Sequence, residues 1–274
     1  MTVEIGPRTQ LCGVILHPAG HTRSPAMHNA AFAALGIDAV YVALDVAPRN
    51  LEAALAGARA LGFRQLAVSI PHKETVMPHL DAIDAIARRI GAVNTVTREG
   101  ERLVGSNSDW LGVVRALERE TTISGRDAVV LGAGGAARAA VFGLLERGAR
   151  VRILNRDRER AERLAADLGA SGAGGLDGLS GLPCEILVNT TSVGLREDAS
   201  PVAADAIAED AVVLDAVYDP PLTRLLRDAR SRRARTIQGK WWLVHQAAEQ
   251  IRVWTDRDAP VEVMGSAFDR ASEP

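Results

Sequence analysis

The sequence predicts an α/β protein of two domains, one of which is a Rossmann-type, doubly wound dinucleotide-binding domain. Three observations support this prediction. The chain has 274 residues, enough for two domains of ordinary size. Apolar strand-like segments alternate with helical segments along its length, which is the pattern of a parallel sheet covered by helices. Residues 129–138 read as a buried strand that turns tightly into a helix.

That turn carries the clearest functional signal. Gly132, Gly134 and Ala137 fit the G-x-G-x-x-[GA] pattern. The first glycine permits the tight turn, the second lets the backbone approach a pyrophosphate, and the small third residue lets helix and strand pack closely. The free N–H groups at the helix start then hold the phosphates. A helix over 136–146 and a strand over 150–154 complete a βαβ unit, so the pattern favours nucleotide binding over a purely structural turn.

In chain order, the first 107 residues predict an α/β domain. We expect strands over 10–16, 39–46 and 65–70, a helix that begins at Ser24-Pro25 with Ser24 as N-cap, and a helix over 48–61. Short helices are expected over 72–77 and 81–90, followed by a hairpin of 91–98 and 102–105. The β-α-β-α-β order implies a parallel sheet.

From residue 109 onward, the sequence predicts the elements of the nucleotide-binding domain and a final helix. Helices are expected over 109–120, 158–168 and 222–229, strands over 186–188, 211–214 and 236–237, and a glycine-rich loop over 169–181. The last helix is predicted over 242–255. We expect one domain to comprise residues 1–107 plus 240–274, and the nucleotide-binding domain to comprise residues 108–239.

The composition excludes several classes of protein. The net charge of −2 argues against a nucleic-acid or membrane partner. No apolar run is long enough to span a membrane, and no signal-peptide pattern is present, so we expect a soluble cytoplasmic enzyme. Cys12 and Cys184 are predicted to be buried and free, and the six histidines lack the compact spacing of metal ligands, so no metal site is predicted.

The use of lysine indicates either a titratable amine or surface lysines retained by chance. Of the 32 basic residues only Lys73 and Lys240 are lysines. Arginine stays protonated, whereas lysine releases a proton when its surroundings lower its pKa. Lys73 follows the third strand, and Asp109 lies at a predicted helix start. Asp109 is either a simple N-cap or the partner of a lysine that passes a proton to a substrate oxygen.

Several segments, in order along nearly the whole chain, resemble the motifs of the shikimate dehydrogenases. They are His21-Thr22-Arg23-Ser24-Pro25, Val68-Ser69-Ile70-Pro71-His72-Lys73, Gly91-Ala92-Val93-Asn94-Thr95, Asn107-Ser108-Asp109, the turn from Gly132 to Arg138, Asn155-Arg156, Asn189-Thr190-Thr191-Ser192-Val193-Gly194, Asp215 with Tyr218 and Pro220, and Gly239 with Gln246. The chain is therefore identified as similar to that family.

The resemblance implies reversible, NADP-dependent reduction of 3-dehydroshikimate to shikimate, with a small cyclic hydroxy acid as substrate. It implies that residues 1–107 plus 240–274 form the substrate-binding catalytic domain, and that Lys73 and Asp109 are catalytic and handle the proton. The implied substrate-binding residues are Thr22, Ser24, Ser69, Asn94, Tyr218 and Gln246. The implied cofactor-binding residues are Gly132, Ala133, Gly134, Gly135, Ala136, Asn155, Arg156, Thr190, Thr191, Ser192 and Gly239. These residues come from both domains, so we expect the site between them.

The cofactor prediction depends on the end of the second nucleotide-domain strand. Asn155-Arg156 ends that strand, and Arg158 and Arg160 follow, as the 2′-phosphate of NADP requires. Asp157, where the family has threonine, adds a negative charge and so argues against NADP. We therefore predict NADP, with NAD the less favoured cofactor.

Departures from the family pattern leave the substrate open. They are Ala67, Ser106, Trp110, Lys240, Trp241 and Trp242. A dehydrogenase for quinate or an aminoshikimate is the alternative, because one bulky ring or charge changes what a pocket accepts. A non-catalytic sensor of nucleotide or shikimate is an alternative of another class, against which the Lys73–Asp109 pair argues. A monomer or a homodimer is expected.

Overall fold

The computed structural model describes residues 5–20 and 22–271, and it confirms the predicted α/β class. The chain divides into two compact units. The first runs to Ser108 and resumes at Gln246, and the second comprises Asp109–His245. Each unit contains one six-stranded sheet. None of the helices in the described part of the chain has the length and hydrophobicity needed to span a membrane.

The sheet of the first unit is mixed, with the order β2-β1-β3-β5-β6-β4. The strands β1 (Gln10–Leu16), β2 (Ala39–Asp45) and β3 (Gln65–Val68) are parallel, as expected. The strands β5 (Thr95–Glu99) and β6 (Arg102–Ser106) form the predicted hairpin; β5 runs antiparallel to both β3 and β6. β4 (Ala82–Ile83) pairs with β6. The prediction of a parallel sheet was therefore wrong beyond β3, because the hairpin adds its strands to the same sheet.

Helices α1 (Ser24–Leu35) and α2 (Leu51–Ala60) follow β1 and β2, with the short 3₁₀ helix η1 (Pro48–Asn50) before α2. Ser24 is the first residue of α1 and not its N-cap. Arg23 occupies the cap position, and no side chain caps this helix. The predicted position of the cap was wrong by one residue.

Two further helix predictions need correction. Residues 72–76 form turns, and only Met77–His79 are helical, as the 3₁₀ helix η2. Helix α3 (Ala85–Ile90) begins at Ala85, not at residue 81, because Asp84 caps it by accepting a hydrogen bond from the N–H of Ala87 at 2.6 Å.

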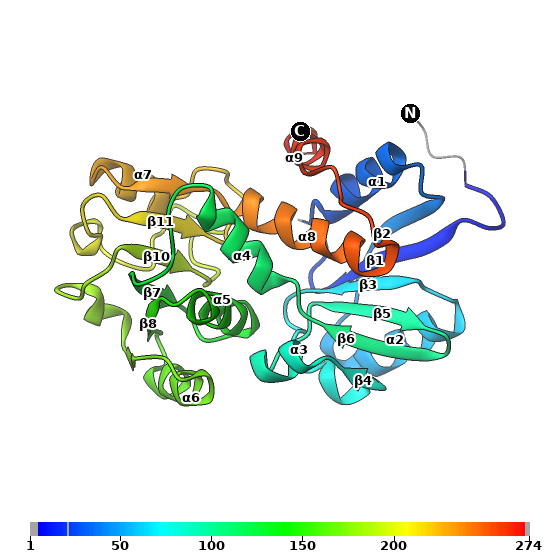
Figure 1. Ribbon diagram of the computed structural model, residues 1–274, viewed down its shortest axis with the longest axis horizontal. Coiled ribbons are helices and arrows are strands. Elements are labelled where there is room, and N and C mark those ends of the chain that lie inside the picture. Colours follow the sequence, from blue (N-terminus) through cyan, green and yellow to red (C-terminus); the bar gives the residue numbers. More distant parts are fainter. Residues whose placement is uncertain (1–4, 21, 272–274) are drawn as a thin grey trace. The chain divides into compact units, whose positions relative to one another are not determined.

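The sequence analysis missed the final helix of the described chain. α8 (Gly239–Thr255) begins three residues earlier than predicted, and α9 (Val261–Arg270) follows it. α9 packs against α1 and buries Met264, Ala267 and Phe268 (Figure 1).

The second unit is a doubly wound parallel sheet of the order β12-β11-β10-β7-β8-β9. Its strands are β7 (Asp127–Leu131), β8 (Arg150–Leu154), β9 (Gly172–Gly174), β10 (Ile186–Asn189), β11 (Val212–Asp215) and β12 (Arg235–Ile237). The order reverses between β7 and β10, which is where such sheets bind ligands. The glycine-rich loop was only partly a loop, because β9 and the 3₁₀ helix η3 (Leu176–Leu179) lie within it.

Helices α5 (Gly135–Glu146), α6 (Arg158–Leu168) and α7 (Arg224–Ser231) connect these strands, and α4 (Asp109–Glu118) packs beside α5 (Figure 1). A core of strand residues such as Val129, Leu187 and Val213 packs with Leu225 and Leu226 of α7. These strands read as continuous apolar runs because helices cover both faces of a parallel sheet.

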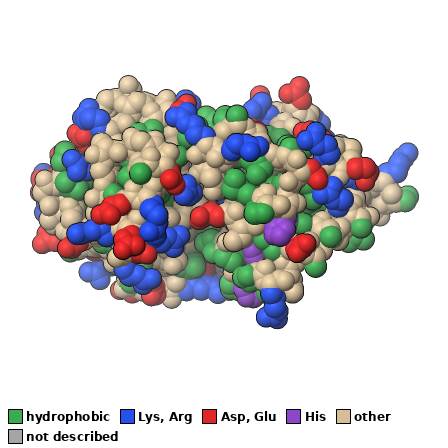
Figure 2. Space-filling view, turned by 90° about the horizontal axis from the view of Figure 1, so that it is seen from below, with side chains coloured by type: hydrophobic (Ala, Val, Ile, Leu, Met, Phe, Trp, Pro, Cys, Tyr) green, Lys and Arg blue, Asp and Glu red, His purple; other side chains and the backbone are tan. Residues whose placement is uncertain are grey.

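The cysteines agree with the sequence-based prediction, and the surface charges are mixed. On the face drawn in Figure 2, acidic and basic side chains are intermingled. Both cysteines are buried and free. Burial raises the pKa of the Cys12 thiol to about 12, and it does the same to the Cys184 thiol.

β2 is an edge strand whose free side is closed by one side chain. The Asn29 carboxamide donates to the backbone oxygen of Tyr41 at 2.9 Å and accepts from its N–H at 2.8 Å. Tyr41 is only 2% exposed, so these backbone groups have little access to water. A side chain that occupies both groups also keeps other strands from pairing there.

We expect Asn29→Ala to lower the free energy of unfolding by roughly 1–3 kcal/mol, because it leaves a buried donor and acceptor unsatisfied. Asn50→Ala is the matched control. Asn50 is exposed, and its side chain caps no helix, so the change there should stay within about 0.5 kcal/mol. Urea unfolding of both variants measures the difference. Equal shifts of the two midpoints would contradict the edge-closing role of Asn29.

Candidate functional site

The glycine turn after β7 is built for close approach of a ligand. Gly132 has a φ of +114°, and a Cβ atom there would lie 2.3 Å from the Thr190 hydroxyl oxygen. Gly134 is the N-cap of α5, and no side chain caps that helix. Ala137 is fully buried where α5 packs on the sheet. The first N–H groups of α5 are therefore left for an anion, as a dinucleotide-binding turn requires.

The loop after β10 packs against this turn. Thr190 donates a hydrogen bond from its hydroxyl to the Leu131 carbonyl at 2.7 Å, and its N–H donates to the same oxygen at 2.9 Å. Thr191 donates through its N–H and its hydroxyl to Asn189 Oδ1, at 3.0 and 2.8 Å. Ser192 follows and is exposed. The structure thus brings the Thr190–Ser192 segment to the side of the predicted phosphate-binding turn.

The end of β8 has the predicted cationic character. Arg156 is exposed, and Asn155 donates from Nδ2 to the Asp157 carbonyl at 2.9 Å. Asp157 is the N-cap of α6, where its carboxylate accepts from the N–H of Arg160 at 3.2 Å. The guanidinium of Arg160 lies 3.5 Å from the Ala133 carbonyl oxygen. Asp157 therefore stabilises the helix that carries Arg160.

In the first unit, Asn94 is the centre of a buried polar network. Its Nδ2 donates to Gln246 Oε1 at 3.2 Å and to the Ser108 hydroxyl at 3.0 Å. Its Oδ1 accepts from the Ser108 N–H at 2.7 Å and from the Thr95 hydroxyl at 2.9 Å. Asn94 is 1% and Gln246 6% exposed. Two predicted substrate-binding carboxamides are thus brought together, and each fixes the orientation of the other.

Gln250 lies one helical turn after Gln246 and extends this network. Its Nε2 donates to the Asn94 carbonyl and to the Thr95 hydroxyl, both at 3.1 Å. Sequence analysis did not single out Gln250, and it named Thr95 and Ser108 only as members of motifs, without a role of their own. The spacing of four between the two glutamines on one helix was the available signal.

Of the other predicted substrate-binding residues, Thr22, Ser24 and Ser69 lie after β1 and β3, and Tyr218 follows β11 in the second unit. Thr22 and Ser24 have their hydroxyl oxygens 3.3 Å apart, and Ser24 is 5% exposed. His21 of the same motif lies outside the described residues. The backbone of Ser69 donates to Ile15 at 3.0 Å and accepts from His72 at 2.8 Å. These backbone bonds fix the loop after β3 beside the end of β1.

The two predicted catalytic residues have defined backbone positions. The carbonyl of Lys73 accepts from the N–H of Val93 at 2.8 Å, and the imidazole of the buried His72 is hydrogen-bonded to the Val46 carbonyl at 2.7 Å. Lys73 is half-buried. Asp109 is 4% exposed and begins α4, immediately after Ser108 of the Asn94 network.

Two of the three tryptophans that depart from the family pattern have packing roles. Trp110 lies edge-on to Phe142 at 5.5 Å, between α4 and α5, and Trp242 is 5% exposed. Trp241 is half-buried, with the Arg119 guanidinium carbon 3.9 Å and the Lys240 Nζ 4.9 Å from its ring centre. Burial, and then the charges of Arg119 and Arg115, lower the pKa of the neighbouring His245 to about 4. His245 is therefore neutral at pH 7.

Comparison with known proteins finds matches over most of the chain. Residues 14–96 match the shikimate dehydrogenase substrate binding domain, residues 115–182 the shikimate / quinate 5-dehydrogenase family, and residues 243–265 the shikimate 5′-dehydrogenase C-terminal domain. A shikimate dehydrogenase (NADP(+)) of Halorubrum lacusprofundi is 47% identical over 268 residues, covering 93% of this chain and 97% of that protein. The chain belongs to the shikimate dehydrogenase family.

Solved structures of the family have the same fold. A shikimate dehydrogenase in complex with NADP⁺ has a TM-score of 0.94 and 38% identity, covering 99% of this chain and 98% of that one. The enzyme from Thermus thermophilus in complex with NADP(H) and shikimate has a TM-score of 0.90 and 37% identity, covering 96% and 99%. The resemblance inferred from the sequence motifs is confirmed.

We expect Gly132→Ala to weaken NADP binding by at least about tenfold, because the added methyl group meets the Thr190 hydroxyl and the backbone conformation disfavours alanine. Gly57→Ala is the matched control. Gly57 lies within α2, and a Cβ atom there would have nothing within 4 Å, so alanine should stabilise that helix by up to about 1 kcal/mol. A fluorescence titration with NADP⁺ compares the two. Wild-type affinity in Gly132→Ala would show that the turn does not approach the cofactor.

Proposed function

We propose that this chain catalyses the reversible, NADP-dependent reduction of 3-dehydroshikimate to shikimate. The observation that carries the proposal is that the family's motif residues are present in order along a chain that belongs to the family. The glycine turn supports the cofactor part, because Gly132 leaves room for a pyrophosphate and the start of α5 leaves N–H groups to bind it.

NADPH supplies the hydride when it is bound. Gly132, Ala133, Gly134, Gly135 and Ala136 hold its pyrophosphate, and Thr190, Thr191, Ser192 and Gly239 line the remainder of its path. Asn155 and Arg156, with Arg160, receive the adenosine ribose and its 2′-phosphate. A planar guanidinium matches phosphate geometry, so these arginines favour NADP over NAD.

Lys73 donates a proton to the oxygen that becomes the shikimate hydroxyl, and it accepts that proton in the reverse direction. Asp109 is the partner that orients the amine. Thr22 and Ser24 bind the substrate carboxylate through their hydroxyls, while Ser69, Asn94, Gln246 and Tyr218 hold the ring hydroxyls. The mutual hydrogen bond of Asn94 and Gln246 holds both carboxamides in place before the substrate arrives, so less rotamer freedom is lost on binding.

The direct test is oxidation of shikimate by the purified chain, followed as NADPH absorbance. We expect kcat/KM to be higher for shikimate than for quinate, and at least about tenfold higher with NADP⁺ than with NAD⁺, because Arg156 and Arg160 lie just after the end of β8. A higher kcat/KM for quinate would favour the alternative substrate. Nucleotide binding without turnover of any cyclic hydroxy acid would favour a sensor.

Lys73→Arg separates proton transfer from charge attraction. Arginine keeps the positive charge but does not release its proton, because its pKa stays above about 12. We expect Lys73→Arg to lose at least about 10²-fold in kcat, with a much smaller change in KM, since acid–base assistance is typically worth that much.

The same substitution at the only other lysine is the matched control. Lys240 neighbours the ring of Trp241, a position for which arginine is also suited, so Lys240→Arg should affect kcat far less. Steady-state kinetics with shikimate and NADP⁺ measures both variants. A Lys73→Arg enzyme with near-normal kcat would leave Lys73 with a purely electrostatic role.

A further inference from the structure

The carboxylate of Asp215 is buried at the carboxyl end of β11 and joins three segments of the second unit. Its side chain is fully buried. Oδ1 accepts from Asn189 Nδ2 at 2.8 Å and from the N–H of Val217 at 3.0 Å, and Oδ2 accepts from the Thr223 hydroxyl at 2.6 Å. Burial raises the pKa of this carboxyl, while the three hydrogen bonds act in the opposite direction. The Asn189 Nδ2 and the Val217 N–H can only donate, and the Thr223 hydroxyl donates here, so a carboxylate, which only accepts, satisfies all three.

The first segment is the loop beside the glycine turn. Because Asp215 only accepts hydrogen bonds, Asn189 must point its Nδ2 at Asp215 and its Oδ1 the other way. Oδ1 then accepts from both the N–H and the hydroxyl of Thr191. Thr190, the residue between them, donates to the Leu131 carbonyl next to Gly132. The orientation of one amide, set by Asp215, therefore determines the start of this loop.

The second segment is the turn that carries Tyr218. Asp215 holds the N–H of Val217, and the N–H of Ala216 donates to the Asn189 carbonyl at 2.9 Å. The start of α8 packs on the same turn. A Cβ atom at Gly239 would lie 2.7 Å from the Asp215 carbonyl oxygen and 2.6 Å from that of Ala216. The turn before Tyr218 and Gly239 at the start of α8 are thus both positioned by the Asp215–Ala216 segment.

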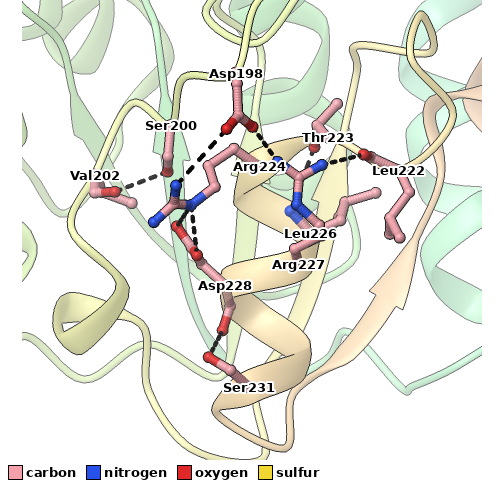
Figure 3. A network of polar contacts seen from close by, with 10 residues as sticks. All are labelled: Asp198, Ser200, Val202, Leu222, Thr223, Arg224, Leu226, Arg227, Asp228 and Ser231. Atoms are coloured by element: carbon pink, nitrogen blue, oxygen red, sulfur yellow. Dashed lines mark hydrogen bonds and ion pairs between the residues drawn. The ribbon is translucent and has the colours of Figure 1, made fainter.

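The third segment is the start of α7. Thr223 donates to Asp215 and caps α7 by accepting from the N–H of Leu226 at 3.3 Å. Figure 3 shows the ion pairs that join the outer side of this helix to the loop after Ser192. Asp198 forms ion pairs with Arg224 and Arg227, and Arg224 also binds Asp228 at 2.8 Å. The buried carboxylate therefore holds the start of this loop from the inside, whereas the exposed ion pairs on the outside contribute little to its position.

We propose that Asp215 is a positioning residue that sets the Thr190–Thr191 loop and the Val217–Tyr218 turn together. Cofactor binding and substrate binding then depend on the same buried carboxylate. This inference rests on the proposed function, which places Thr190 and Thr191 at the cofactor and Tyr218 at the substrate. Asp215 itself acts through Asn189, Val217 and Thr223 and contacts neither ligand.

Asp215→Asn tests the proposal with little change in volume. It replaces one acceptor oxygen by an NH₂ group. If that group faces Asn189 and Val217, it meets other donors; if it faces Thr223, it reverses that hydrogen bond and leaves the Thr223 hydroxyl proton without its acceptor. A buried unsatisfied group of this kind corresponds to about a tenfold loss or more, so we expect that weakening in the Kd for NADP⁺ and in the KM for shikimate. We expect kcat at saturation to change far less than either.

Thr223→Val and Thr223→Ser form a matched pair of variants that tests the same network from the partner's side. Valine removes the hydroxyl that Asp215 binds, whereas serine retains it, so Thr223→Val should reproduce the effect and Thr223→Ser should restore both binding constants. Asp198→Asn is the surface control. It removes the same charge from an exposed side chain of the same loop, and we expect its binding constants to stay within about twofold of wild type.

The Kd for NADP⁺ is measured by tryptophan fluorescence, and the KM by steady-state turnover. Circular dichroism establishes that each variant is folded, and if Asp215→Asn does not fold, the Thr223 pair decides. Weakening of both constants supports the proposal. Unchanged binding of NADP⁺, weakening of only one ligand, or equal effects of Thr223→Ser and Thr223→Val would overturn it. The fluorescence titration needs no turnover, so it tests the role of Asp215 even if the substrate is another compound. Wild-type protein that binds NADP⁺ but does not oxidise shikimate would refute the proposed substrate alone.

Discussion

Buried amides and carboxylates persist in an apolar interior only when their hydrogen-bonding groups are matched. Both units of this protein place such groups at the ends of strands or directly beside them. In the first unit the Asn94 carboxamide binds Ser108, Thr95 and Gln246, and in the second the Asp215 carboxylate binds Asn189, Val217 and Thr223. Because each donor needs an acceptor, these networks have few alternative arrangements. The predicted ligand-binding residues beside them are therefore oriented before a ligand arrives.

Sheet topology explains why these networks lie beside functional motifs. β7, β10 and β11 are parallel neighbours, so their carboxyl ends meet at one edge of the sheet. Gly132, Thr190 and Val217 follow those three ends within one or two residues. Segments that are far apart in sequence thus form one surface, and the tight Gly132 turn lets Thr190 pack directly against it. The same rule holds for β1 and β3, whose following loops carry Thr22 and Lys73.

The segments that sequence analysis assigned correctly are those with strong local patterns. The strand over 150–154 and the helix over 158–168 have the predicted bounds because apolar periodicity and the Asp157 cap are local signals. β9 was missed because Gly172-Ala173-Gly174 has no strand-like side chains and is held by pairing with β8. The helix predicted over 72–77 does not form as such: the Lys73 carbonyl accepts from the N–H of Val93, and the N–H of Met77 donates to Glu74 instead of to Lys73. Trp110 was considered for the substrate pocket, yet packing on Phe142 determines its place.

The sequence by itself determined the α/β class, the nucleotide-binding turn, the family and the motif residues, because glycine spacing, strand periodicity and motif order are properties of neighbouring residues. Only the tertiary structure decided which buried groups support those motifs. Asp215 reads as one carboxylate in a motif, and Gln250 as one polar residue of a helix. Their partners Asn189 and Thr95 are brought to them by strand pairing and helix packing, which join segments that no local pattern in the sequence relates.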